Sequence, residues 1–266
     1  MRLGIGIPTS NRPKHLKKLL YSIKNQVRSI LNMSDIIIVE DSKSDLPASI
    51  EQSRDNCYYK ELISPATFKV IEGYRKGPQY CHQQILNHFA KKNEIPFILR
   101  LDDDIELISP HFINRLWKMI NSACDIHAVG GIFINQRSQE SPCIGWDYHC
   151  QMRRNKARAP FEVSHLYSSY IYRKEIALMV GGFPLYYSII GHREETDFSL
   201  RLKNQGKGRL FVDPQAIAIH HQASFGGVRH PHYDKLCKED DLMFRDKMAK
   251  LGIHIKGRFN GKPMYL

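Results

Sequence analysis

The first hundred residues alternate apolar runs with amphipathic helical segments, and this alternation limits the fold more than any other feature. Strands are predicted at LGIGIPT (3–9), DIIIVED (35–41), FKVIEG (68–73) and FILRL (97–101). Helices are predicted at 10–27, where Ser10 or Asn11 can cap the helix and Pro13 suits its first turn, and at 80–92. Strands that are apolar on both faces and joined through helices form parallel sheets covered on both sides. The sequence therefore predicts an α/β fold with a mostly parallel sheet.

The rest of the chain is less regular. Ser109-Pro110 is predicted to open a helix, 127–134 to form a strand, 193–206 a short helix that ends at Gly206, and 209–221 another strand. Residues 135–165, which are polar, basic and aromatic, are predicted to be loops, followed by a turn at 180–183 and a charged helix from about 233.

Acidic and polar side chains follow several of the predicted strands. They are Thr9, Glu40, Asp41, Asp102, Asp103 and Asp104. Ligands of open α/β sheets bind beyond the carboxyl ends of the strands, so these side chains are expected to meet at one edge. Three adjacent carboxylates repel one another, and burial adds to the cost. Mg²⁺ or Mn²⁺ with a bound diphosphate would relieve this repulsion; an acidic turn after a strand is the plain alternative.

Two common nucleotide-binding motifs are missing. Gly4 and Gly6 begin a Gly-x-Gly pattern, but Thr9 stands at the place of the third glycine and Pro8 interrupts the turn. No GxxxxGK[ST] sequence occurs. The sequence therefore argues against a typical dinucleotide-binding turn and excludes a P-loop.

Composition favours a soluble protein. The chain has 266 residues, 42% of them hydrophobic, and no apolar run near the roughly 18 residues of a membrane span. Its first residues lack the apolar region of a secretory signal. We expect a cytoplasmic protein that contacts a membrane at most peripherally. The formal charge of +12 suits binding to an anionic membrane, to nucleic acid or to an anionic substrate. The plain alternative is a basic surface that only contacts solvent.

The six cysteines form no CxxC pair and are expected to be free thiols. Cys143 and Cys150 in CIGWDYHC do not match a common zinc-finger spacing.

Five short motifs, in order, resemble those of the family 2 inverting glycosyltransferases, which have the GT-A fold. IGIPTSNRPKHLKKLLYSI is similar to their opening strand and helix, IIIVEDSKSD to IIVVDDGSTD, and KGPQYCHQQIL, more weakly, to GPAAARNLGI. LDDDIEL matches their DxD motif, and VGGF with REETDFSLRLKNQG resembles GGF…GEDTDLSLRLRRAG. The resemblance covers roughly 3–221. It implies one GT-A domain over 1–266, with a nucleotide-sugar half (1–105), an acceptor and catalytic half (106–232) and a C-terminal helix and tail (233–266).

The resemblance also implies binding residues, position by position. Thr9 and Asp41 would contact the nucleotide base, and Asp41 would accept the N3–H of a uracil, so a UDP-sugar is the expected donor. Asp102 would lie near the ribose and the metal, and Asp104 would bind Mn²⁺ or Mg²⁺. The implied nucleotide-binding set is Pro8, Thr9, Asn11, Arg12, Glu40, Asp41, His82, Asp102 and Asp103, although the family often has arginine where His82 stands.

The stretch Glu194-Glu195-Thr196-Asp197 stands at the place of the family's EDxD. Glu195 takes the position of the catalytic base, one methylene longer than the usual aspartate. Asp197 and Glu194 stay candidates, because a helix puts those two on one face and Glu195 about 100° away. An acid-rich first helical turn is the plain alternative. The implied reaction is inverting transfer of a sugar to a hydroxyl of a glycan, lipid-linked or other acceptor, as in polysaccharide biosynthesis.

Further candidates are histidines, an aromatic residue and two glycines. Many GT-A enzymes place a late histidine on the metal, which points to His220 and His221; neighbours in a strand face opposite ways, so at most one is expected to reach it. Trp146 is predicted to stack on a sugar ring beside Asp147, with core packing as an equal alternative. Gly181 and Gly182 would let the backbone approach the donor sugar.

Two other functional classes stay open. A retaining GT-A transferase or a sugar nucleotidyltransferase would use a similar site, but the glycine-rich signature of nucleotidyltransferases is missing. A non-catalytic basic protein would bind a membrane surface or nucleic acid and show no metal-dependent affinity for nucleotides; no specific nucleic acid is expected.

Overall fold

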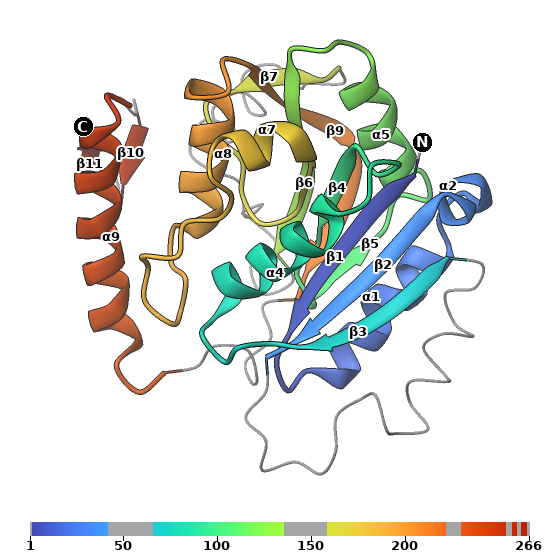
Figure 1. Ribbon diagram of the computed structural model, residues 1–266, viewed down its shortest axis with the longest axis horizontal. Helices are drawn as coiled ribbons and strands as arrows, with labels where there is room; N and C mark the ends of the chain where they lie inside the picture. Colours follow the sequence, from blue (N-terminus) through green and yellow to red (C-terminus); the bar gives the residue numbers. More distant parts are fainter. Residues whose placement is uncertain are drawn as a thin grey trace.

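The computed structural model describes residues 2–41, 66–135, 159–221, 230–253, 257–259 and 262–264. Within these residues, a nine-stranded sheet lies between helices on both faces (Figure 1). Its strands are β1 (Leu3–Thr9), β2 (Ser34–Glu40), β3 (Thr67–Glu72), β4 (Phe97–Arg100), β5 (Ile105–Leu107), β6 (Ile126–Asn135), β7 (Phe161–Val163), β8 (Tyr170–Arg173) and β9 (Arg209–His220).

The helices are α1 (Pro13–Lys24), α2 (Arg28–Asn32), α4 (Pro78–Ala90), α5 (Phe112–Asn121), α7 (Lys174–Met179), α8 (Glu194–Asn204) and α9 (Tyr233–Lys250). A short hairpin of β10 (Gly257–Phe259) and β11 (Lys262–Met264) follows α9. The long predicted elements are confirmed within a few residues. The capping prediction for the first helix was wrong: Arg12 is the N-cap of α1, without a side-chain cap.

The sheet is mixed, with the order β3-β2-β1-β4-β8-β6-β9-β5, and β7 pairs with β9. Strands β3, β2, β1 and β4 are parallel to one another, as expected from their apolar sequences. Strand β8 runs antiparallel between β4 and β6, and β5 runs antiparallel beside β9. Strands β5, β7 and β8, which have only three or four residues, were not predicted, and β7 lies within 135–165, which were expected to be loops.

Alternate side chains of the strands pack on opposite faces of the sheet. Ile36 and Ile38 belong to the apolar cluster under α1 and α5, whereas Ile37 and Val39 belong to the cluster under α4 and α8. The predicted burial on both faces is therefore confirmed. Gly6 lets α4 approach β1, because a Cβ at this position would lie 2.4 Å from Ile85 Cγ2.

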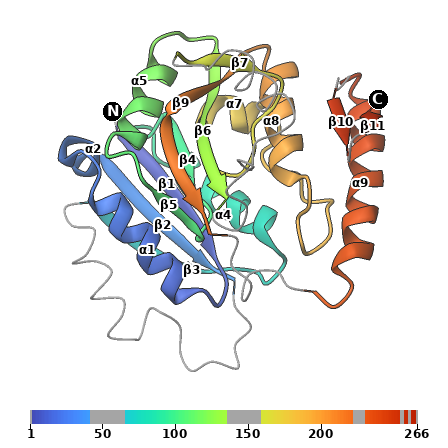
Figure 2. The ribbon, with the colours of Figure 1, turned by 180° about the vertical axis from the view of Figure 1, so that it is seen from behind.

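Helix α9 lies at one side of the molecule, next to α8 and the loop before it (Figure 2). Phe244 and Met248 of α9 pack with Tyr187 and Leu200 in a small apolar cluster. Among the described residues, no helix is long and apolar enough to cross a membrane. In the same part of the chain, Cys81, Cys124 and Cys237 are free thiols, as predicted; Cys143 and Cys150 lie outside it.

Candidate active site

A cavity of about 590 Å³ opens at the carboxyl ends of β1 and β4. Its lining comes from the β1–α1 turn, the β4–β5 turn, the start of α8 and the end of β9. The lining residues are Pro8, Thr9, Ser10, Arg12, Asp41, Pro78, Cys81, Arg100, Asp102, Asp103, Asp104, Tyr167, Ser168, Ile190, Gly191, His192, Arg193, Glu194, Glu195, His220 and Tyr233. The expected meeting of polar strand ends at one edge of the sheet is thus observed.

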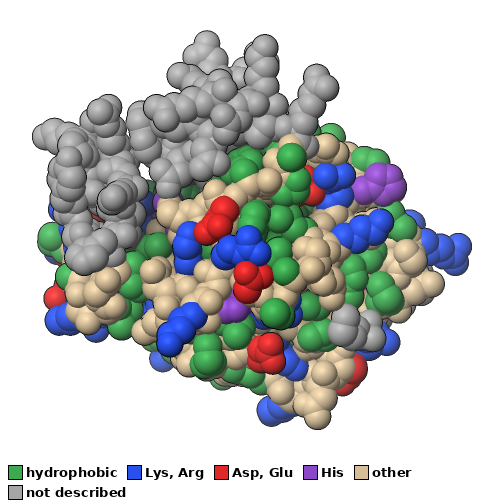
Figure 3. Space-filling view, turned by 90° about the horizontal axis from the view of Figure 1, so that it is seen from above, with side chains coloured by type: hydrophobic (Ala, Val, Ile, Leu, Met, Phe, Trp, Pro, Cys, Tyr) green, Lys and Arg blue, Asp and Glu red, His purple; other side chains and the backbone are tan. Residues whose placement is uncertain are grey.

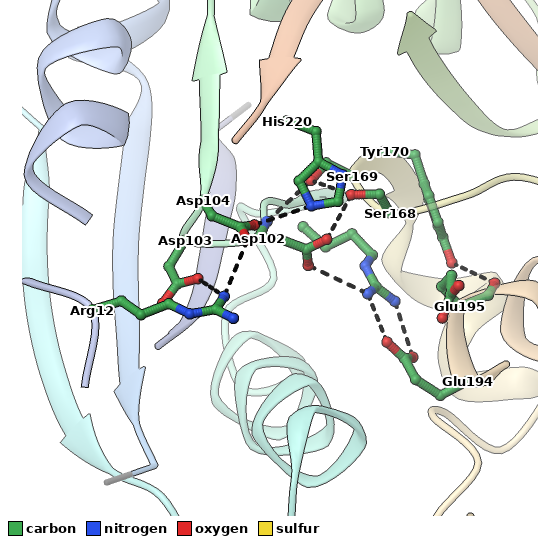
Figure 4. Close-up of polar contacts among 11 residues, drawn as sticks. Arg12, Asp102, Asp103, Asp104, Ser168, Ser169, Tyr170, Glu194, Glu195 and His220 are labelled. Carbon is green, nitrogen blue, oxygen red and sulfur yellow. Dashed lines mark hydrogen bonds and ion pairs between the residues drawn. The ribbon is translucent and has the colours of Figure 1, made fainter. Parts of the chain in front are cut away.

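The three aspartates of the β4–β5 turn point in different directions (Figure 4). Asp102 accepts a hydrogen bond of 2.6 Å from the Ser168 hydroxyl and lies 3.7 Å from the Arg100 guanidinium. Its backbone N–H donates to the hydroxyl of Ser169 at 3.0 Å. The carboxylate of Asp102 is therefore held toward β8 and Arg100.

Asp103 points toward the β1–α1 turn. It accepts hydrogen bonds from the Thr9 hydroxyl and from Arg12, both at 2.8 Å, and its side chain is buried. Burial raises the pKa of Asp103 to about 6, against the lowering effect of Arg12. Arg12 also donates to Asp104 at 3.2 Å, so one guanidinium offsets part of the repulsion between the two neighbouring carboxylates.

Asp104 faces the end of β9, because β5 pairs with β9 in a register that brings Ile105 beside His220. His220 Nε2 lies 3.3 Å from Asp104 Oδ1, and His220 lines the cavity. His221 turns the other way, and its Nε2 lies 2.8 Å from a carboxylate oxygen of Glu106. Only His220 of the predicted histidine pair therefore borders the cavity.

The cavity suits a hard divalent cation with few protein ligands. In the described part of the chain, no three His, Cys, Asp or Glu side chains gather closely enough to hold an ion alone. Asp104 and His220 supply one carboxylate and one imidazole on the same wall. This pair fits Mn²⁺ or Mg²⁺, which take one or two protein ligands when phosphate oxygens and water complete the shell. Asp102 is less well placed, since it faces Ser168 and Arg100.

Arg100 and Glu194 form a buried ion pair below the cavity. Their two parallel hydrogen bonds measure 2.7 and 3.1 Å, and both side chains are 3% exposed. The Arg100 guanidinium also lies 5.3 Å from the ring centre of Tyr170. Burial raises the pKa of Glu194 while Arg100 lowers it. Glu194 is thus held by Arg100 and poorly placed to accept a proton from a substrate.

Arg100→Met is expected to destabilise the fold by about 3–5 kcal/mol, because it leaves the Glu194 carboxylate buried and unpaired. The double change Arg100→Met with Glu194→Leu should recover most of that loss, since two apolar side chains replace the pair. Urea unfolding of the three proteins measures the difference. Equal destabilisation of the single and double variants would contradict this ion-pair role.

Asp197 is buried and fully engaged. It accepts hydrogen bonds from the hydroxyls of Tyr186 and Tyr187, the latter at 2.8 Å, and from Arg201 at 2.7 Å. It does not line the cavity. Glu195 does line the cavity and is partly exposed, and no side chain within the described residues bonds to its carboxylate. Glu195 is therefore the most accessible of the three predicted acids.

Helix α9 holds the loop that leads into Glu195. Asp240 accepts hydrogen bonds from the backbone N–H and hydroxyl of Ser188, both at 2.8 Å, and from the N–H of His192 at 3.0 Å. Arg193, with a φ of 76°, donates to Asp241 at 2.7 Å. These contacts fix the chain immediately before α8.

Asp240→Ala is expected to lower turnover roughly tenfold or more through misplacement of Glu195, with little effect on nucleotide binding. The measurement compares kcat with the affinity for a nucleoside diphosphate. Asp234→Ala, at an exposed position of the same helix, is the matched control. If both variants kept full turnover, the loop would not depend on Asp240.

The predicted nucleotide-binding residues divide into two groups. Pro8 and Asp41 line the cavity with Thr9, Arg12, Asp102 and Asp103, whereas Asn11 and Glu40 do not. Asp41 already accepts the backbone N–H groups of Arg75 at 2.5 Å and Gly77 at 3.1 Å, and so also holds the loop before α4.

His82 lies in the core rather than at the cavity. Its ring stacks on Phe183 at 5.0 Å, and it is 1% exposed. Among the described residues, neither of its ring nitrogens has a hydrogen-bond partner. This placement does not support the predicted role in nucleotide binding.

Burial holds the pKa of His82 well below its ordinary value of 6.5. As the pH falls below 6.5, the unfolded chain binds a proton that the folded chain excludes, so stability falls. His82→Phe should remove this loss. The difference in free energy of unfolding between the variant and the wild type should therefore shift in favour of the variant by about 1.4 kcal/mol per pH unit below 6.5. Denaturant unfolding between acidic and neutral pH tests this; a difference independent of pH would contradict it.

Gly181 and Gly182 both have positive φ, at 84° and 73°, but neither lines the cavity. A Cβ at Gly182 would lie 2.3 Å from the Gln83 amide oxygen, so this glycine serves packing. Trp146 and Asp147 lie outside the described residues.

Several residues of the cavity, among them Arg100, Ser168 and Tyr233, were not predicted from the sequence. An arginine inside an apolar strand is a usable signal, because such a charge needs a buried partner. Ser168 and Tyr233 carry no comparable signal.

The fold of this chain is similar to that of known proteins, although its sequence is not. No protein-family model and no curated protein sequence matches the chain. Three solved structures resemble it along nearly its whole length. The fold is that of the GT-A glycosyltransferases. The prediction of a GT-A fold is thereby confirmed.

The first of these GT-A structures is the mannosyltransferase PcManGT from Pyrobaculum calidifontis in complex with GDP-Man and Mn²⁺, with a TM-score of 0.66, 14% identity and 97% of this chain covered. GalNAc-T7 with UDP, GalNAc and Mn²⁺ has a TM-score of 0.66 at 15% identity over 92% of this chain. TarS from S. aureus has a TM-score of 0.60 at 17% identity over 94% of this chain. The matches span 66%, 50% and 73% of those chains.

Proposed function

We propose that this protein is a metal-dependent glycosyltransferase that moves a sugar from a nucleotide-diphosphate donor to an acceptor hydroxyl. One observation carries the proposal. Glu195, at the start of α8, borders the same cavity as the Asp104–His220 pair, within a GT-A fold (Figure 4). A single displacement at an anomeric carbon needs a general base and a metal ion near the leaving group, and this cavity has a candidate base and two candidate metal ligands.

In this reaction, Glu195 accepts the proton of the acceptor hydroxyl as its oxygen bonds to the anomeric carbon. The bond from that carbon to the diphosphate breaks, and the anomeric centre inverts. Asp104 and His220 would hold Mn²⁺ or Mg²⁺, which supplies positive charge for the leaving diphosphate. Ser168 and Arg100 hold the Asp102 carboxylate on the wall of the same cavity.

The donor nucleotide is proposed to lie over Pro8 and Asp41, on the side of the cavity formed by 1–105. Asp41 can accept from the N3–H of uracil with its remaining lone pairs, which supports a UDP-sugar. The acceptor, a glycan or lipid-linked hydroxyl compound, would enter on the side formed by 106–232, where Glu195 lies.

The test is incubation of the purified protein with UDP-, GDP-, dTDP- and CDP-sugars and Mn²⁺, with nucleoside diphosphate release as the readout. Release from one donor, stimulated by Mn²⁺, is expected. Proton NMR of the product then reports the anomeric configuration, and inversion is the predicted outcome. Retention would overturn the single displacement, and a lack of release with every donor and acceptor mixture would count against transferase activity.

A further inference from the structure

The start of the chain is basic and free of acid. Residues 1–34 contain no Asp or Glu, but they contain Arg2, Arg12, Lys14, Lys17, Lys18, Lys24 and Arg28. Five of these cations, from Lys14 to Arg28, fall on or directly after α1. Residues 1–34 therefore carry seven cationic side chains and no carboxylate side chain, against a formal charge of +12 for the whole chain.

Helix α1 turns its cations outward. Leu16, Leu19, Leu20 and Ile23 are buried in the core, whereas Lys14, Lys17, Lys18 and Lys24 are exposed. The positions 14, 17, 18, 21 and 24 recur at three- and four-residue intervals, which places them along one stripe of α1, and the exposed Arg28 opens α2 after the turn that follows. We call the exposed side chains of Lys14, Lys17, Lys18, Tyr21, Lys24 and Arg28 the α1 basic face.

Four cations of this face have no ion-pair partner among the described residues. Within the described part of the chain, Lys14, Lys18, Lys24 and Arg28 form no ion pair. Some cations elsewhere on the surface are paired, as in Lys203 with Glu162 and Arg209 with Asp125. Figure 3 shows another face, on which Lys, Arg, Asp and Glu side chains are interspersed. Among the described residues, the α1 basic face thus forms a local group of positive charges.

Two large apolar side chains accompany these cations. Tyr21 is 42% exposed within the face, and Ile108 is 49% exposed. The residues on either side of Ile108 are bonded to α1 and the turn after it, because Leu107 N–H donates to the Ser22 hydroxyl at 3.0 Å and the Gln26 amide donates to the Ser109 carbonyl at 3.1 Å. Cations beside exposed tyrosine and isoleucine are complementary to an anionic lipid surface, which offers both charge and an apolar layer.

We propose that the α1 basic face, with Ile108, docks the protein on an anionic lipid bilayer. The helix starts next to Arg12, which lines the cavity, and its 12 residues extend about 18 Å from there. Docking would hold the cavity close to the lipid surface. If the proposed transferase function holds, this arrangement favours an acceptor carried by the membrane.

The experiment is co-sedimentation of the full chain with phosphatidylcholine vesicles, with and without phosphatidylserine. Binding only to the vesicles that contain phosphatidylserine, weakened by salt, is expected. Lys14→Gln, Lys18→Gln and Lys24→Gln together should weaken binding about a hundredfold, since each lysine near a lipid surface is worth about fivefold. No donor or metal is present, so the result does not depend on the transferase activity.

The matched control is the triple change Lys91→Gln, Lys207→Gln and Lys238→Gln, which removes the same charge from exposed sites at the end of α4, in the turn after α8 and on α9. It should bind nearly as well as the wild type. Equal losses in both triple variants would show a response to net charge alone and overturn the proposal. Absence of vesicle binding, or a preference for polyuridylate over vesicles that depends on the same lysines, would also overturn it.

Discussion

Glu195→Gln is expected to abolish sugar transfer and to leave nucleotide binding unchanged. The substitution keeps the shape of the side chain and removes its ability to accept a proton. A positioned general base contributes roughly 10²–10⁴-fold to a rate, so turnover should fall about a hundredfold or more. The measurement pairs the initial rate at saturating donor with calorimetric binding of the nucleoside diphosphate. Unchanged binding separates a lost base from a damaged site.

Two further variants make the assignment specific. Asp197→Asn alters a carboxylate that serves two tyrosines and Arg201, so it should lower stability more than chemistry. Glu175→Gln, at an exposed position of α7, controls for the loss of one negative charge. A folded Asp197→Asn protein without activity, beside an active Glu195→Gln protein, would move the base to Asp197.

Asp104→Ala is expected to remove Mn²⁺-dependent donor binding. A divalent ion stabilises the charge of a diphosphate by several kcal/mol, which corresponds to more than about a hundredfold in affinity. Asp104 is the carboxylate that lies 3.3 Å from His220, and no other pair of this kind borders the cavity among the described residues. Binding of a nucleoside diphosphate with Mn²⁺ and with chelator measures the loss.

Glu106→Gln is the matched control for Asp104→Ala. Glu106 lies two residues further along β5, pairs with His221 and does not line the cavity. It should retain the difference between Mn²⁺ and chelator. If Asp104→Ala also retained that difference, the metal would have to be held elsewhere.

Local sequence patterns predicted the parallel half of the sheet well. Runs such as DIIIVED bury both faces, and that composition is typical of central parallel strands. The antiparallel strands β5 and β8 were not predictable, because three or four residues give no periodicity. Yet β5 is essential to the geometry of the site, since its pairing with β9 brings Asp104 close to His220.

The chemistry of the cavity was predictable in type but less so in role. The acidic turn and the acid-rich start of α8 were found from sequence, and the structure places both at one cavity. Which acid is free depends on distant partners: Glu194 pairs with Arg100, and Asp197 bonds to Tyr187 and Arg201. Such pairs form across the fold and leave no local pattern.

The central claim is a metal-dependent nucleotide-sugar site at the carboxyl edge of the sheet. Calorimetric titration of the wild type with UDP, GDP, dTDP and CDP, each with Mn²⁺ and with chelator, tests it most directly. The predicted result is binding of one nucleoside diphosphate, UDP in first place, that requires Mn²⁺. Failure of all four to bind, or binding that is equally tight in chelator, would contradict the proposed site.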